Sequence, residues 1–240
     1  MIAAVRVLLL FAALLLDFVF CMVVGAFCPR HPNLVYIFSR PFGWVLPLLG
    51  INAVVRRPPL AELPPRAVYI CNHQNTYDLL VCANAVPPRT VTIGKRSLLF
   101  VPFFGLMYWL TGNILIDRNN RNKAADTISE SARQINQRNM NVWMFPEGTR
   151  SRGRGLLPFK SGAFKLAARA GVPIVPVVTG PLDKLSLNRW NNGTVIVQYL
   201  PPLTVQEGDD LQAVARHVHA EMLTCLGRLA DEQNGKGHSA

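Results

Sequence analysis

The chain has 240 residues, of which 50% are apolar and only 16% are charged, and its 17 Gly and 18 Pro follow no period. This composition excludes a disordered coil and a fibrous repeat, and the length predicts one domain with a short appendage. The mean hydropathy of +0.22 is high for a wholly soluble enzyme and points to membrane contact. The net charge of +11 predicts a polyanionic partner, which is lipid, a phosphorylated substrate or nucleic acid.

An apolar segment opens the chain. Residues 7–27 are 21 residues with Asp17 as the only charge, and a bilayer core of about 30 Å needs a helix of roughly 20 apolar residues. We expect a membrane helix retained in the mature protein and not a cleaved signal peptide, because the run exceeds a usual signal core and Cys28-Pro29-Arg30 lacks small cleavage-site residues. Whether the helix spans the bilayer or lies in one leaflet stays open.

A second apolar stretch, residues 34–50, contains Arg40-Pro41 and either re-enters the membrane, lies along its surface or forms an ordinary buried helix. Arg6 precedes the first apolar segment, whereas Arg30, Arg40 and the strongly basic remainder follow it. This asymmetry places the bulk of the chain on the cytoplasmic side, with a basic face against anionic lipid. The five cysteines are an odd number without CxxC spacing, which favours a reducing compartment over a disulfide framework or zinc site.

After residue 50, short β-branched runs alternate with longer helical patterns, which predicts an α/β fold with a mixed, largely parallel sheet flanked by helices. We expect three regions: a membrane-associated helical segment at 1–50, an α/β domain at 51–230 and a disordered tail at 231–240. The predicted strands are 53–56, 68–71, 90–93, 114–116, 142–145, 174–178 and 195–199. The predicted helices are 77–85, 121–138, 161–170 and 211–229.

The first candidate site follows the predicted strand 68–71, where α/β domains place reacting groups. His73 suits proton transfer near neutral pH, and Asp78, five residues on, can fold back through a turn at Asn75-Thr76 to hold the other ring nitrogen. A surface His–Asp pair is the plain alternative. Cys71 is expected to be a core residue, and His217 and His219 to be solvated residues of an amphipathic helix.

The second candidate site is Phe145-Pro146-Glu147-Gly148-Thr149-Arg150-Ser151, again at the exit of a predicted strand. An Arg among hydroxyls and flexible backbone suits a phosphate, while Glu147 either orients Arg150 or accepts from a substrate hydroxyl. Residues 117–169 hold 11 basic and 4 acidic residues, and a solvated helix face does not explain Arg150, Arg152 and Arg154 in their Gly-rich loop. Residues 112–118 bring Arg118 to a third strand end, so the motifs suggest one site with a base and two Arg ligands for phosphate.

With these motifs the chain resembles the glycerolipid acyltransferases. Four segments of the sequence match the four motifs of this family, in the same order. They are His73-x4-Asp78, residues 112–118, the run from Phe145 to Ser151 and Val172-Pro173-Ile174-Val175-Pro176. The stretches at 94–105 and 117–121 are similar specifically to bacterial 1-acyl-sn-glycerol-3-phosphate acyltransferases. The resemblance reaches from the apolar N-terminus to about residue 203.

The resemblance implies transfer of a fatty acyl group from acyl-CoA or acyl carrier protein to the sn-2 hydroxyl of lysophosphatidate, giving phosphatidate at the bacterial inner membrane. His73 would be the general base and Asp78 its partner, without a covalent intermediate, a metal or a resident cofactor. Arg150, with Arg118 and Lys95, would hold the phosphate, and Glu147, Gly148 and Thr149 would shape the glycerol pocket. The donor, the chain length and the oxyanion stabiliser stay open.

Three alternatives remain. An acyltransferase of the same family would act on a different lysolipid or on glycerol 3-phosphate. A membrane-anchored lipid esterase would use a similar His–Asp pair, but the GxSxG sequence expected of it is absent. A basic membrane-surface or RNA-binding module would explain the charge, but the chain has no RNP-like or zinc-knuckle pattern, and we expect no nucleic-acid partner.

Overall fold

The computed structural model describes residues 2–117 and 121–235, without the side chains of residues 121–124. Its α-helices are α1 (Ile2–Phe27), α2 (Leu34–Trp44), α3 (Asp78–Val81), α4 (Phe104–Leu110), α5 (Arg121–Arg138), α6 (Gly162–Ala170) and α7 (Leu211–Gln233). Short 3-10 helices are η1 (Pro47–Leu49), η2 (Leu60–Glu62), η3 (Cys82–Asn84) and η4 (Arg96–Phe100). The strands are β1 (Ile51–Arg56), β2 (Val68–Cys71), β3 (Thr90–Lys95), β4 (Ile114–Ile116), β5 (Asn141–Met144), β6 (Ile174–Thr179) and β7 (Gly193–Tyr199).

These strands form one sheet in the order β1-β7-β6-β2-β5-β3-β4. All neighbours run parallel except β6 and β7, which pair antiparallel. The predicted fold class, a mixed and largely parallel sheet with flanking helices, is therefore confirmed. Each predicted strand forms, with its ends within two residues of the prediction.

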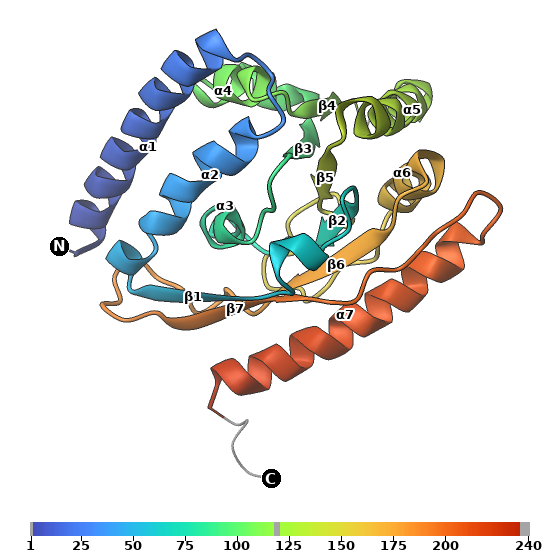
Figure 1. The fold of residues 1–240 in the computed structure, drawn as a ribbon. Helices are drawn as coiled ribbons and strands as arrows, with labels where there is room; N and C mark the ends of the chain where they lie inside the picture. The colour runs from blue at the N-terminus through green and yellow to red at the C-terminus, as the bar shows by residue number, and fades with distance from the viewer. Residues whose placement is uncertain (1, 118–120, 236–240) are drawn as a thin grey trace.

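Helices flank both faces of the sheet (Figure 1), and its central strands β2 and β6 are buried along their whole length. In β2, Val68 and Ile70 pack into a core that includes side chains of α5, α6 and α7. Tyr69 and Cys71, which alternate with them, pack into a second core on the side of α3 and η1. A strand buried on both faces reads as a continuous apolar run, which is why this short strand was visible in the sequence.

Helix α1 is long and apolar enough to cross a membrane, and most of its side chains are exposed. Its buried residues are Arg6, Asp17, Cys21 and Gly25, which form the side that faces the domain. The second apolar stretch forms α2, which buries Leu34, Phe38 and Phe42 and leaves Trp44 exposed at its end. It is therefore a packed helix between α1 and the domain (Figure 1).

Both ends of α1 are fixed to the domain. The guanidinium of Arg6 is buried and donates to backbone carbonyls, at 2.9 Å to Leu48, 2.9 Å to Leu187 and 3.1 Å to Trp190, and also to Arg189. At the other end, Gly25 lies so close to Leu110 that a Cβ would come within 2.3 Å of its side chain. The apolar helix is thus part of the folded unit along its length.

The helices differ from the prediction in three places. The predicted helix 77–85 is one turn of α-helix, α3, followed by η3, and α4 was not predicted. Helix α7 continues past residue 229 to Gln233, so it enters the segment that was predicted as a tail from 231.

Candidate active site

The sheet order brings the predicted site segments to one edge. His73 comes two residues after β2, the Glu147–Arg150 loop follows β5, and Lys95 is the last residue of β3. Strands β2, β5, β3 and β4 are parallel neighbours in that order, so their carboxyl ends lie side by side. This is the edge at which open α/β sheets bind ligands. Arg118, after β4, lies outside the described residues.

The predicted His–Asp pair forms. His73 Nδ1 lies 2.7 Å from Asp78 Oδ2, and the same carboxylate oxygen accepts from the backbone N–H groups of Gln74 at 2.6 Å and Asn75 at 3.0 Å. The predicted turn closes because the Asn75 side chain accepts from the N–H of Tyr77 at 2.9 Å. Asp78 is the first residue of α3 and is buried, so its carboxylate is fixed by the turn and not by solvent.

The imidazole is held on its face as well as at Nδ1. The ring of His73 stacks on Phe145, with 4.1 Å between centroids and 19° between planes. Its side chain is 20% exposed, whereas that of Asp78 is 2% exposed. Within the described residues Nε2 has no hydrogen-bond partner, so the nitrogen opposite the aspartate is the one available to a ligand.

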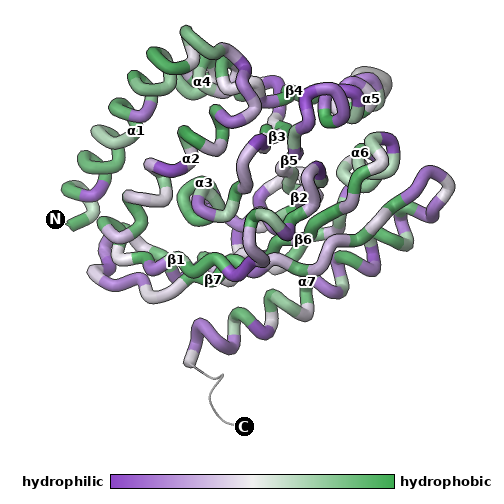
Figure 2. Tube along the Cα trace, in the orientation of Figure 1, coloured by the Kyte–Doolittle hydropathy of each residue, from purple (hydrophilic) through white to green (hydrophobic). Residues whose placement is uncertain are grey.

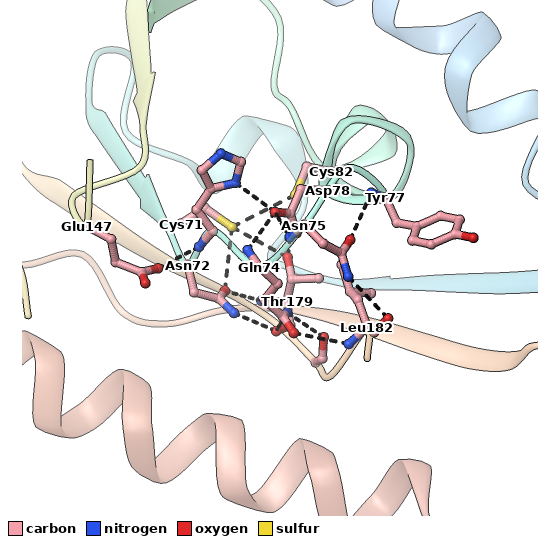
Figure 3. Close-up of polar contacts among 12 residues, drawn as sticks. Cys71, Asn72, Gln74, Asn75, Tyr77, Asp78, Cys82, Glu147, Thr179 and Leu182 are labelled. Carbon is pink, nitrogen blue, oxygen red and sulfur yellow. Dashed lines mark hydrogen bonds and ion pairs between the residues drawn. The ribbon is translucent and has the colours of Figure 1, made fainter. Parts of the chain in front are cut away.

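Glu147 connects the two site segments. Its Oε1 accepts from the N–H of His73 at 2.6 Å, and its Oε2 accepts from the N–H of Leu157 at 3.0 Å (Figure 3 shows the first contact). Burial raises the pKa of Glu147, and the two N–H groups act against that shift. Because both oxygens are used internally and the side chain is 3% exposed, the predicted roles of orienting Arg150 or accepting from a substrate do not match these contacts.

The Arg-bearing loop is attached directly to the histidine segment. The N–H of Ser151 donates to the carbonyl of His73 at 2.7 Å, and that of Arg152 donates to the carbonyl of Gln74 at 2.9 Å. These bonds place Thr149 and Arg150, both exposed, next to the residues that follow β2. The predicted proximity of the first two motifs therefore occurs in the structure.

Lys160 is a cation of this region that the sequence did not single out. Its Cε and Nζ lie 3.0 Å from the point that a Cβ on Gly148 would occupy, and Gly148 has a φ of +71°. The N–H of Lys160 donates to the carbonyl of Pro146 at 2.9 Å. Lys160 stands alone before a predicted helix in the sequence, so only the fold reveals that it lies over the glycine. Lys95 is exposed at the end of β3.

A polar clamp also holds the histidine segment to β6, and no pattern in the sequence indicated it. Asn72 exchanges hydrogen bonds of 2.7 Å and 2.8 Å with the backbone of Thr179. Gln74 donates to the carbonyls of Thr179 and Gly180 and accepts from the N–H of Leu182 (Figure 3). Cys71 is a core residue, as expected, and burial raises its pKa well above the usual thiol value.

An apolar cavity of about 360 Å³ adjoins the His–Asp segment. Its walls come from α1, α2 and α3, and the residues between His73 and Asp78 contribute Thr76 and Tyr77. Asp17 of α1 also lines it, buried and without a hydrogen-bond partner for either carboxylate oxygen among the described residues. Apart from Asp17 and Thr76 the lining residues are apolar, which suits an aliphatic group.

The part of the chain that the structure describes contains no cluster of three or more His, Cys, Asp or Glu residues able to hold a metal ion. The arrangement at the sheet edge offers instead an oriented imidazole, exposed cations and a neighbouring apolar cavity.

The family model described as "Acyltransferase" matches residues 55–180, which contain the His–Asp pair and the Arg-bearing loop. The chain belongs to the acyltransferase family. The predicted family, and the prediction that the chain is an acyltransferase, are confirmed.

Curated relatives of this acyltransferase carry a more specific name. It is 52% identical over 217 residues, 89% of each chain, to the 1-acyl-sn-glycerol-3-phosphate acyltransferase of Salmonella typhimurium, and 50% identical with the same coverage to that of Escherichia coli. The human 1-acyl-sn-glycerol-3-phosphate acyltransferase alpha is 38% identical over 79% of this chain and 69% of the human one. The predicted similarity to the bacterial enzymes is therefore confirmed.

A solved structure shares the fold of this acyltransferase. The 1-acyl-sn-glycerophosphate (LPA) acyltransferase PlsC of Thermotoga maritima aligns with a TM-score of 0.63 over 95% of this chain and 97% of the other, at 20% sequence identity. The similarity therefore extends over nearly the whole of both chains and shows a common fold.

Proposed function

We propose that this protein transfers a fatty acyl group from acyl-CoA or acyl carrier protein to the sn-2 hydroxyl of 1-acyl-glycerol 3-phosphate, giving phosphatidate. The observation that carries the proposal is the 2.7 Å pairing of His73 Nδ1 with Asp78 Oδ2, which leaves Nε2 for the substrate. The names of the bacterial relatives, at about half identity over most of the chain, support this choice of acceptor.

The chemistry follows from the orientation of the ring. With Nδ1–H donating to Asp78, the lone pair lies on Nε2, which takes the hydroxyl proton as the oxygen attacks the thioester carbonyl. The new C–O bond forms, the C–S bond breaks, and the imidazolium returns its proton to the departing thiolate. Asp78 stabilises the transient positive charge, and a thioester is sufficiently activated that no covalent enzyme intermediate is required.

Exposed cations at the same edge would bind the acceptor's phosphate. We assign this role to Arg150 with Lys95 and Arg118, and we add Lys160 because it lies over the glycine that precedes Thr149 and Arg150. Guanidinium and ammonium groups form strong charge-assisted bonds to phosphate. Gly148 and Thr149 would shape the glycerol pocket, whereas Glu147 would act as a positioning residue through the backbone of His73.

The apolar cavity between α1, α2 and α3 would take an aliphatic chain of one of the substrates. The exposed apolar side of α1 indicates membrane association, and a bacterial inner membrane with the catalytic domain on the cytoplasmic side is our proposal for the location. A cytoplasmic location would also give access to acyl-CoA and acyl carrier protein. Metal ions and resident cofactors have no part in the proposed steps.

The deciding experiment incubates the purified protein in vesicles with lysophosphatidate and labelled acyl-CoA. We expect labelled phosphatidate, its loss in His73→Ala and Asp78→Asn, and no loss in His217→Ala, a matched change at an exposed histidine of α7. Acylation of another lysolipid or of glycerol 3-phosphate in preference would replace the proposed acceptor. Release of free fatty acid without transfer would establish an esterase.

A further inference from the structure

The segment between β3 and β4 carries an exposed apolar surface. Phe100 is 82% exposed, Phe103 68% and Leu106 52%, and Val101 and Trp109 are also exposed. We call these five residues the α4 apolar surface. Large exposed side chains of this kind, gathered within ten consecutive residues, mark an interaction surface on a folded protein.

This surface is continuous with the apolar side of α1. The rings of Phe18 and Phe103 meet edge to face, with 5.3 Å between centroids. On their inner sides the two helices share a small core, in which Cys21 of α1 packs with Met107 and Leu110 of α4. Figure 2 shows the hydrophobic colour passing from α1 to α4, which lies beside its carboxyl end. Lipid that covers α1 must therefore also meet α4.

Cations border the α4 apolar surface. Lys95 and Arg96 are exposed five and four residues before Phe100, and the guanidinium of Arg30 lies 5.9 Å from the ring centroid of Trp109 at the other end of the surface. Aromatic residues and cations are the usual anchors at a membrane–water interface, and anionic lipid attracts the cations. Charge and hydropathy thus both fit a bilayer and do not suit a polar partner.

We propose that the α4 apolar surface is a second lipid-contacting surface, seated in the same leaflet as the neighbouring side of α1, with Lys95, Arg96 and Arg30 at headgroup level. The 3-10 helix η4 links Lys95 to Phe100, and its five residues rise about 2 Å each, about 10 Å in all. Insertion of Phe100 would therefore bring the end of β3 within about 10 Å of the lipid-contacting surface. The proposal concerns membrane contact and does not depend on the reaction that the enzyme catalyses.

The test measures lipid contact residue by residue in the full chain. Starting from a Cys28→Ser background, because the other four cysteines are buried, Phe100→Cys, Leu106→Cys and Leu223→Cys are each labelled with an environment-sensitive fluorophore. Leu223 is the matched control, since it is 49% exposed on α7. The proteins are reconstituted into phosphatidylethanolamine–phosphatidylglycerol vesicles with or without brominated acyl chains, and Leu16→Cys on α1 provides the lipid-facing reference.

We expect labels at positions 100 and 106 to be quenched several-fold by brominated chains, as at position 16, while the label at position 223 is unchanged. Emission that stays typical of water at positions 100 and 106, with quenching at position 16, would overturn the proposal. Emission typical of an apolar site without bromine quenching would also overturn it, because protein, such as a second copy of this chain, would then cover the surface. Far-ultraviolet circular dichroism of each labelled variant establishes that it is folded, and the two independent positions guard against a local defect.

Discussion

The main-chain N–H of His73 donates to the Glu147 carboxylate at 2.6 Å, so the proposed base is positioned by an acid from the neighbouring strand's loop. The other oxygen of Glu147 holds Leu157 in the same loop. One buried side chain therefore couples the position of the histidine to that of the segment that bears Arg150.

Replacing this acid tests the coupling. In Glu147→Gln one carboxylate oxygen becomes an amide NH₂ that faces a backbone N–H. A buried donor left without a partner lowers the free energy of unfolding by about 1–3 kcal/mol. For a chain of this size each kcal/mol lowers the melting temperature by about 2–4 °C. We expect a lower melting temperature and a fall in kcat of about tenfold, measured by thermal unfolding and acyl-transfer assays. Glu221→Gln, at an exposed glutamate, is the control, and equal behaviour of the two variants would refute the positioning role.

The same residue predicts a pH dependence of stability. Burial raises the pKa of Glu147 in the folded protein, so the folded state binds this proton more tightly than the unfolded chain does. Its contribution to the free energy of unfolding therefore falls as pH rises from the unfolded pKa through the folded one. Urea unfolding across the mildly acidic range should show this slope reduced in Glu147→Gln. A slope unchanged by the substitution would assign the dependence to other groups.

The catalytic pair should behave as a unit. General-base catalysis typically contributes about 10²–10⁴-fold, so His73→Ala and Asp78→Asn should each lower kcat within that range. The double variant should be little worse than His73→Ala alone, since the aspartate acts through the imidazole. Single-turnover acyl transfer measures all three rates. If the loss of kcat in the double variant equals the product of the two single losses, Asp78 acts independently of the imidazole.

Arg150→Ala should mainly weaken binding of the acceptor. A charge-assisted hydrogen bond is worth about 1.5–3 kcal/mol, which predicts a rise of about 10- to 100-fold in KM for lysophosphatidate with much less change for acyl-CoA. Arg216→Ala, on the exposed side of α7, should change neither constant. Equal damage to both constants in Arg150→Ala would indicate that the loop is structural.

Substitutions at two glycines of the same loop distinguish the effect of backbone strain from the effect of a contact with Lys160. Gly148 and Gly153 have φ of +71° and +82°. Alanine at either position should therefore lower the free energy of unfolding by roughly 1–2 kcal/mol. A Cβ at Gly148 would also press on Lys160, whereas at Gly153 it meets nothing within 4 Å. We therefore expect Gly148→Ala, but not Gly153→Ala, to raise KM for lysophosphatidate beyond the shared loss of stability. Similar constants in the two variants would exclude Lys160 from the phosphate site.

Local patterns predicted the strands well, because β-branched runs such as Val68–Cys71 are buried on both faces. They also predicted the His73–Asp78 pair, since a five-residue turn is a local event. Helix α4 was not predicted because its apolar residues face both α1 and the outside, so they show no amphipathic period. Its start at Phe103, with a φ of +61°, likewise gives no recognisable capping signal.

Contacts between strands far apart in the sequence could not be predicted. From the sequence, Glu147 is interpreted as a substrate ligand beside Arg150. The pairing of β2 with β5 places the N–H of His73 within hydrogen-bond distance of its carboxylate, and this pairing is seen only in the fold. The clamp from Asn72 to Thr179 likewise depends on the pairing of β2 with β6. One sequence does not determine the strand order, so the roles of these two side chains were assigned only from the fold.

The burial of Arg6 bears on any attempt to prepare this enzyme without detergent. Deleting α1 would remove the Arg6 guanidinium, which donates to four backbone carbonyls. It would also expose Phe42 and Leu80, which form part of the cavity wall. Such a truncation should yield insoluble protein instead of a free catalytic domain. Solubility is better sought by polar substitutions on the outward side of the helix, at positions such as Leu8 and Leu16, with the inward side left intact.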